Sequence, residues 1–157
     1  MQTFRSFDFG ALGHVDGDGP HFYRAPLKAH MPDTPFAGRE IAELPRVEIL
    51  YSYAGADGAL VRAAVAAGAR GLVSAGFAPG SPSPDQREAF LEAAQSGVVV
   101  VQCSRAASGR VAPRRRLKEA GLVAGEDFSP QKARILLMLM LTTTSDIAEI
   151  QKAFQTY

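Results

Sequence analysis

The chain has 157 residues and a formal net charge of +1, from 17 basic and 16 acidic side chains. Its hydrophobic fraction of 46% and charged fraction of 21% are typical of a globular domain and exclude disorder as the main state. The balanced charge argues against a dedicated nucleic-acid binder, and the single cysteine excludes an internal disulfide framework.

The first 45 residues are rich in glycine, proline, aspartate and aromatic side chains. The run Asp16-Gly17-Asp18-Gly19-Pro20 predicts a turn, because glycine supplies positive φ and aspartate bonds its own backbone. Residues 3–9 and 21–24, on either side, are predicted to be the strands of a hairpin. This part lacks the apolar periodicity of an independent fold. We therefore expect residues 1–45 to be a linker or hairpin segment lying on another part of the protein.

From residue 46 onward, the pattern alternates between short apolar runs and amphipathic segments with helix-capping residues. Ser83-Pro84 and Ser129-Pro130 each place serine at the N-cap and proline at the first helical position, while Asp57 and Ser145 are the other predicted caps. Four consecutive valines, residues 98–101, suit a strand buried on both faces. We predict strands over 47–53, 71–74 and 98–102, and helices over 58–67, 84–95, 131–141 and 146–155.

This order predicts an α/β fold, a small parallel sheet flanked by helices in Rossmann-like or flavodoxin-like layers, with an N-terminal hairpin or linker segment. The α/β domain is expected to span residues 46–157. The longest apolar run, residues 135–141, is far shorter than the roughly 20 residues that cross a bilayer. No leader sequence is seen, so the chain as written is expected in the cytoplasm, with no membrane or nucleic-acid partner.

Ligands of open α/β sheets bind beyond the carboxyl ends of the strands. Three small, polar, glycine-rich loops follow the predicted strands, over residues 52–57, 74–81 and 102–109. Their backbone N–H groups suit an anion or a carboxylate, but small residues also make tight turns, and both interpretations stay open here. No dinucleotide fingerprint or Walker A motif occurs.

Cys103 and a cluster of basic residues can each be interpreted either as part of a functional site or as purely structural. Cys103 with a histidine would make a nucleophile pair, but it follows an apolar strand, where a buried structural cysteine is the commoner case. A basic cluster either binds a phosphate or carboxylate or is a solvated loop, which is the favoured interpretation. The cluster consists of Arg110, Arg114, Arg115, Arg116 and Lys118.

Two segments carry motifs with a recognisable sequence. Residues 128–137 read Phe-Ser-Pro-Gln-Lys-Ala-Arg-Ile-Leu-Leu, and residues 104–109 read Ser-Arg-Ala-Ala-Ser-Gly. The first resembles the motif that opens a helix in bacterial L-asparaginases, and the second resembles the Ser-Arg-x-x-x-Gly loop of the same family. Other segments of the chain, before and after these two, also resemble the family and occur in the same order as in its members. The resemblance therefore covers essentially the whole chain. Residues 1–45 look like the segment that joins the family's two domains.

The resemblance is to the smaller, C-terminal domain of an L-asparaginase or asparaginase-glutaminase. The family's threonine nucleophile lies in an N-terminal domain whose motifs do not occur here, and Thr142-Thr143-Thr144 falls at an ordinary helix junction. The resemblance implies a parent enzyme that hydrolyses L-asparagine, or a similar small amino-acid amide, to L-aspartate and ammonia. It implies no catalytic residue in this chain, which alone is expected to be inactive, and no metal or cofactor.

The family's C-terminal domain lends polar side chains to the substrate's α-amino end in a neighbouring subunit. The resemblance therefore implies a pocket wall, a subunit interface, a homo-oligomer and an N-terminal asparaginase domain as partner. Gly55 aligns with a family asparagine and Arg116 with a family glutamate, so asparagine-versus-glutamine preference stays open, as does export of the parent to the periplasm. The substrate-binding candidates are Ser52, Gly55, Arg116 and Glu119. The alternative is a non-catalytic module that binds a small ligand or mediates oligomerisation.

Overall fold

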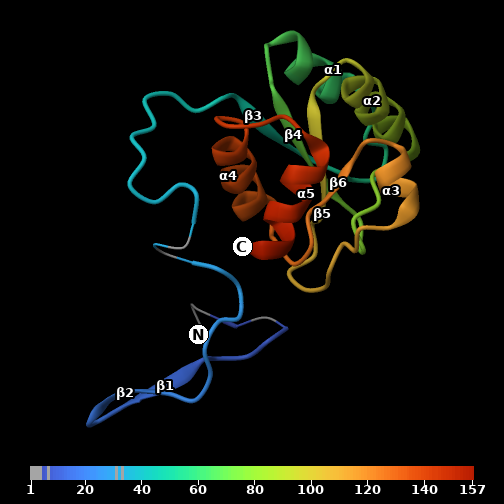
Figure 1. The fold of residues 1–157 in the computed structure, drawn as a ribbon. Helices are drawn as coiled ribbons and strands as arrows, with labels where there is room; N and C mark the ends of the chain where they lie inside the picture. Colours follow the sequence, from blue (N-terminus) through green and yellow to red (C-terminus); the bar gives the residue numbers. More distant parts are fainter. Residues whose placement is uncertain (1–4, 7, 31, 33) are drawn as a thin grey trace.

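A four-stranded parallel sheet, in the order β3-β4-β5-β6, forms the centre of the computed structural model, which describes residues 5, 6, 8–30, 32 and 34–157 (Figure 1). Its strands are β3 (Val47–Tyr51), β4 (Gly71–Gly76), β5 (Val99–Ser104) and β6 (Val123–Ala124). Because the strands appear in the sheet in chain order, each βαβ connection joins neighbouring strands. The predicted fold class is confirmed.

Helices cover both faces of this sheet (Figure 1). Side chains alternate across each strand, so Val73 and Val101 pack into one core, while Leu72 and Val100 pack into the other. The first core is closed by α4 (Pro130–Met140) and α5 (Ile147–Thr156). The second is closed by α1 (Ala59–Ala66), α2 (Pro84–Gln95) and α3 (Arg115–Glu119). Burial on both faces explains why the central strands are continuous apolar runs.

Two predicted helix starts are confirmed by their caps. The Ser83 hydroxyl accepts a hydrogen bond from the Gln86 N–H at 3.3 Å, and α2 begins at Pro84. The Ser129 hydroxyl accepts one from the Lys132 N–H at 3.4 Å, and α4 begins at Pro130. In both helices proline occupies the first turn, where its missing N–H removes no intrahelical bond.

Two other caps differ from the prediction by one residue. Asp146, and not Ser145, caps α5, because its carboxylate accepts from the Glu149 N–H at 2.8 Å. The N-cap of α1 is Gly58, although the Asp57 carboxylate does accept from the Ala59 N–H at 3.0 Å. A carboxylate at a helix start also interacts favourably with the helix dipole, which favours aspartate over serine.

Several strand predictions were incomplete. β3 ends two residues earlier than predicted, whereas β4 and β5 each extend two residues further. β6 was missed because two residues are too few for a periodic pattern. The short helix α3 was also missed, since it lies within the arginine cluster that composition assigned to a loop.

The turn predicted over residues 16–20 is found at residues 17 and 18, between the strands of an antiparallel hairpin, β1 (Gly13–Asp16) and β2 (Gly19–Phe22). The second strand was predicted over 21–24, two residues later than β2. The predicted first strand, residues 3–9, was wrong for its described residues 5, 6, 8 and 9, which form no strand; residues 3, 4 and 7 lie outside the described residues. Glycine is required at position 13, because a Cβ there would lie 1.9 Å from the His21 carbonyl oxygen.

The segment after the hairpin is attached to the α4–α5 side of the sheet. The Ala29 N–H donates to the Thr156 carbonyl at 3.0 Å, and the Phe36 ring lies 6.2 Å from the Tyr157 ring. The hairpin itself projects away from the sheet (Figure 1). It and its flanks expose large apolar side chains, namely Phe9, Val15, Phe22, Tyr23 and Leu27. In the described ranges, no helix combines the length and apolar character of a membrane span.

Candidate functional site

Backbone hydrogen bonds tie together the loops at the carboxyl edge of the sheet. The Ser52 N–H donates to the Ala75 carbonyl at 3.0 Å, just beyond the last residue of β3. The Arg105 N–H donates to the Gly76 carbonyl at 2.8 Å, just beyond β5. The loops after β3, β4 and β5 therefore leave the sheet side by side, as expected for the ligand-binding edge of an open α/β sheet.

The side chain of Ser52, the first candidate, is fully buried. Its hydroxyl donates to Gln86 Oε1 at 2.7 Å, and Gln86 Nε2 donates to the Tyr51 carbonyl at 3.2 Å. The Ser83 hydroxyl, at the N-cap of α2, donates to the Ala56 carbonyl of the same loop at 2.7 Å. Ser52 thus fixes the loop after β3 onto the start of α2, with its hydroxyl directed into the protein.

Gly55, the second candidate, lies in that loop with a φ of +79° and open space where a Cβ would stand. Arg105 also holds this loop, since its Nη1 donates to the Ser52 carbonyl at 2.6 Å. Its guanidinium also lies 4.4 Å from the centre of the Phe77 ring. Arg105 therefore joins all three loops. Arg105 was not among the predicted site residues, although it is the arginine of the Ser-Arg-x-x-x-Gly motif and could have been chosen on that ground.

Arg116, the third candidate, lines an open cleft of about 180 Å³ on the α2–α3 side of the sheet. Glu119, the fourth, is half-exposed and forms an ion pair with Arg115 at 2.6 Å. Neither Glu119 nor the two candidates after β3 line this cleft. The structure therefore does not gather the four candidates around one cavity.

The candidate nucleophiles are unsuited to attack. Cys103 is fully buried in the α4–α5 core, and burial raises the pKa of its thiol to about 12. A catalytic cysteine needs a lowered pKa, so the cysteine–histidine interpretation fails. The hydroxyls of Thr142 and Thr143 donate to the carbonyls of Leu139 and Met140, at 2.7 and 2.9 Å. They complete the end of α4.

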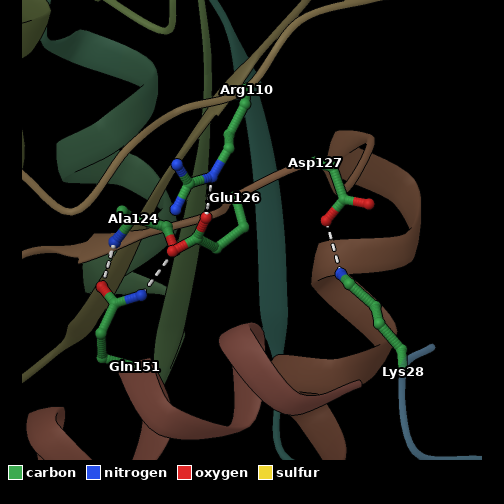
Figure 2. Close-up of polar contacts among 6 residues, drawn as sticks. All are labelled: Lys28, Arg110, Ala124, Glu126, Asp127 and Gln151. Carbon is green, nitrogen blue, oxygen red and sulfur yellow. Dashed lines mark hydrogen bonds and ion pairs between the residues drawn. The ribbon is translucent and has the colours of Figure 1, made fainter. Parts of the chain in front are cut away.

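Beyond β6, consecutive acidic residues bind two different parts of the chain (Figure 2). The Arg110 Nε donates to the Glu126 carboxylate, and this hydrogen bond raises the pKa of the Arg110 guanidinium. Lys28, from the N-terminal segment, donates to the Asp127 carboxylate.

The short strand β6 is also held by a side chain of α5. The Gln151 side chain accepts a hydrogen bond from the Ala124 N–H at 2.8 Å and donates one to the Ala124 carbonyl at 3.2 Å, so it satisfies both backbone groups of Ala124.

In the part of the chain that the structure describes, no group of three or more histidine, cysteine, aspartate or glutamate side chains is arranged to hold a metal ion.

The chain is similar along its whole length to part of several known proteins. Residues 46–154 match the Glutaminase/Asparaginase C-terminal domain family. L-asparaginase 2 of Escherichia coli (strain K12) is 38% identical over 159 residues, which covers 100% of this chain and 46% of that protein. L-asparaginase 2 of Bacillus subtilis (strain 168) is 39% identical over 155 residues, which covers 99% of this chain and 41% of that protein.

A solved structure, that of a probable cytoplasmic L-asparaginase from Campylobacter jejuni, superimposes with a TM-score of 0.92 at 39% identity. The match covers 98% of this chain and 50% of that one. The chain thus spans about half the length of the relatives it matches.

Proposed function

Because the chain belongs to the glutaminase/asparaginase family and corresponds to its C-terminal domain, we propose that it forms a pocket wall and a subunit interface in an L-asparaginase-like amidohydrolase. The proposed reaction is hydrolysis of the side-chain amide of L-asparagine, which consumes one water molecule and gives L-aspartate and ammonia. The observation that carries the proposal is a match over the whole chain that covers about half of each relative.

Amide hydrolysis of this kind needs an activated nucleophile and donors that stabilise the oxyanion. Within the described ranges, the side chains considered above supply no such nucleophile, because the Cys103 thiol is buried and the hydroxyls of Thr142 and Thr143 are bonded to helix carbonyls. We propose that an N-terminal asparaginase domain supplies it, that the assembly is a homo-oligomer, and that this chain alone does not turn over the substrate.

The proposed contribution of this chain is the wall formed by the loops after the strands. Gly55 offers its backbone at an open position, while Ser52 and Arg105 hold that loop in place. Glu119 remains a candidate for a substrate amine, but its pairing with Arg115 must first be broken. Arg116 carries the opposite charge and favours a carboxylate over an amine.

The test is ammonia release from L-asparagine and, separately, from L-glutamine. It uses the purified chain alone and the chain mixed with the N-terminal half of a matched relative. We expect no release from the chain alone and release on mixing. The Gly55→Asn variant serves as a probe of the wall, because it places at this open position the side chain that the family is expected to carry there. It should lower the KM of the mixture for L-asparagine or change its asparagine-to-glutamine ratio, and it should give no activity to the isolated chain. Turnover by the chain alone, or none after stable complex formation, contradicts the proposal.

The alternative function is a non-catalytic module for small-ligand binding or oligomerisation, favoured by the exposed apolar side chains of the N-terminal hairpin. Analytical ultracentrifugation distinguishes the two. A monodisperse chain that stays unchanged when the N-terminal half is added supports the module, whereas complex formation supports the enzyme part. The proposed compartment is the cytoplasm, with the periplasm as the alternative, and cell fractionation tests this.

A further inference from the structure

We propose that the cleft between α2, α3 and the loop of residues 79–82 binds a small organic anion, a carboxylate or phosphate monoester with an apolar body. Three arginines, Arg87, Arg114 and Arg116, line a cleft whose other walls are mainly apolar. The cleft is lined by residues of this chain, and the inference does not require the proposed enzyme function, although Arg116 is also a candidate for the proposed pocket wall.

The three arginines have no internal counter-charge. In the part of the chain that the structure describes, none of their guanidinium groups has a hydrogen-bond or ion-pair partner. The nearby acids on α3 and after β6 are taken, since Glu119 pairs with Arg115 and Glu126 with Arg110. Like charges around one cleft repel one another, and an anion bound between them relieves that repulsion. Guanidinium groups also match carboxylate and phosphate oxygens in a bidentate geometry.

Much of the cleft lining is apolar, which is why we expect an organic ligand. Leu91 of α2, Leu117 of α3 and Leu122 before β6 all line the cleft. An inorganic ion would leave this surface in contact with water, whereas an apolar body would cover it. The volume of about 180 Å³ limits the ligand to a small molecule.

Gln102 supplies a neutral polar group to the lining of the cleft. It follows three buried valines in β5, and strand alternation turns it to the same face as Val100, toward α2 and α3. Among the described residues its side-chain amide has no hydrogen-bond partner, unlike the amides of Gln86 and Gln151. Gln102 is half-buried, so its amide is open to the cleft, and a ligand there would replace water as its hydrogen-bond partner.

The test is isothermal titration calorimetry on the 157-residue chain with benzoate and with phenyl phosphate. Two controls separate the contributions: inorganic phosphate has the charge alone, and benzyl alcohol has the apolar body alone. We expect one of the organic anions to bind one-to-one with a Kd on the order of 1 mM, and both controls to bind at least about tenfold more weakly. If benzoate binds more tightly than phenyl phosphate, the site is specific for carboxylates, and the reverse order indicates phosphate esters.

Two matched variants localise the binding. Arg116→Gln and Arg115→Gln each remove one positive charge from α3, but only Arg116 lines the cleft. We expect Arg116→Gln to weaken binding by about tenfold and Arg115→Gln by less than about twofold. Circular dichroism checks that both variants fold. The proposal is overturned if the folded chain binds neither organic anion, or if both variants weaken binding equally. Because this readout needs no ammonia release, its failure is separate from failure of the proposed enzyme function.

Discussion

The Nε of Arg110 donates a hydrogen bond to Glu126, a residue that is only 5% exposed and has a φ of +54°. The backbone of the same residue accepts from the Val111 N–H at 2.9 Å. Glu126 therefore fastens the long loop after β5 by both its side chain and its main chain. A left-handed conformation costs a non-glycine residue about 1 kcal/mol, and such a residue persists only where its surroundings hold it.

Arg110→Ala should lower the Tm of the chain, because it leaves a buried carboxylate without its cation. Adding Glu126→Gly should restore part of the loss, since glycine removes the carboxylate and adopts the positive φ without strain. Thermal unfolding followed by circular dichroism measures both effects. The control is Arg115→Ala, which breaks the exposed pair with Glu119 and should leave the Tm almost unchanged. Equal effects of the two arginine variants would show that burial of Glu126 does not matter.

The Cys103 thiol should be inert in the folded chain. With a pKa of about 12, very little thiolate exists at pH 8, and the side chain is fully buried. We expect negligible reaction with an aromatic disulfide reagent under native conditions and one thiol per chain in denaturant. Fast native labelling would place Cys103 in a more open environment than the structure describes.

The same thiol makes stability depend on alkaline pH. Its pKa is raised from 9.0 to about 12 on folding, so the folded state holds a proton that the unfolded state loses above pH 9. This contribution is fully present below pH 9 and is lost as the pH rises through about 12. We expect urea unfolding to show a steeper fall in stability from pH 8 to 10.5 in the wild type than in Cys103→Ala. Parallel pH profiles of the two proteins would contradict this.

How well the sequence predicted each element depended on how local its signal was. The starts of α2 and α4 follow from a serine and a proline next to each other, and the capping serine of each was predicted to the residue. The start of α5 was displaced by one residue, because Ser145 and Asp146 are both good caps, and the folded backbone places Asp146 where its carboxylate accepts from the Glu149 N–H. β6 owes its strand conformation to pairing with β5 and to Gln151, which are contacts distant in sequence.

The candidate site was harder to predict because its contacts cross between loops. The bond from Arg105 to the Ser52 carbonyl joins residues 53 positions apart, and no local pattern signals it. Ser52 was chosen as a polar residue beyond a strand, yet its hydroxyl is taken up by Gln86 of α2. The arginine cluster was visible in the sequence, but its division into Arg110 and Arg115 with partners and Arg114 and Arg116 without depends on the fold.

The two serine caps offer a matched comparison, because each precedes a proline at the start of a helix of similar length. Ser83 is buried and also donates to the Ala56 carbonyl at 2.7 Å, whereas Ser129 is exposed and only accepts from the Lys132 N–H. Ser83→Ala therefore removes a cap and leaves a buried carbonyl without its donor, while Ser129→Ala removes a cap that water partly replaces.

We expect Ser83→Ala to lower the free energy of unfolding by about 2 kcal/mol and Ser129→Ala by about 0.5–1 kcal/mol. Urea unfolding measures both, and unchanged m-values would show that the denatured states are comparable. Ser83→Thr keeps the hydroxyl and should recover part of the loss, provided that the added methyl group fits at the start of α2. If Ser129→Ala proves as destabilising as Ser83→Ala, then capping alone accounts for both, and the link from Ser83 to the loop after β3 contributes nothing to stability.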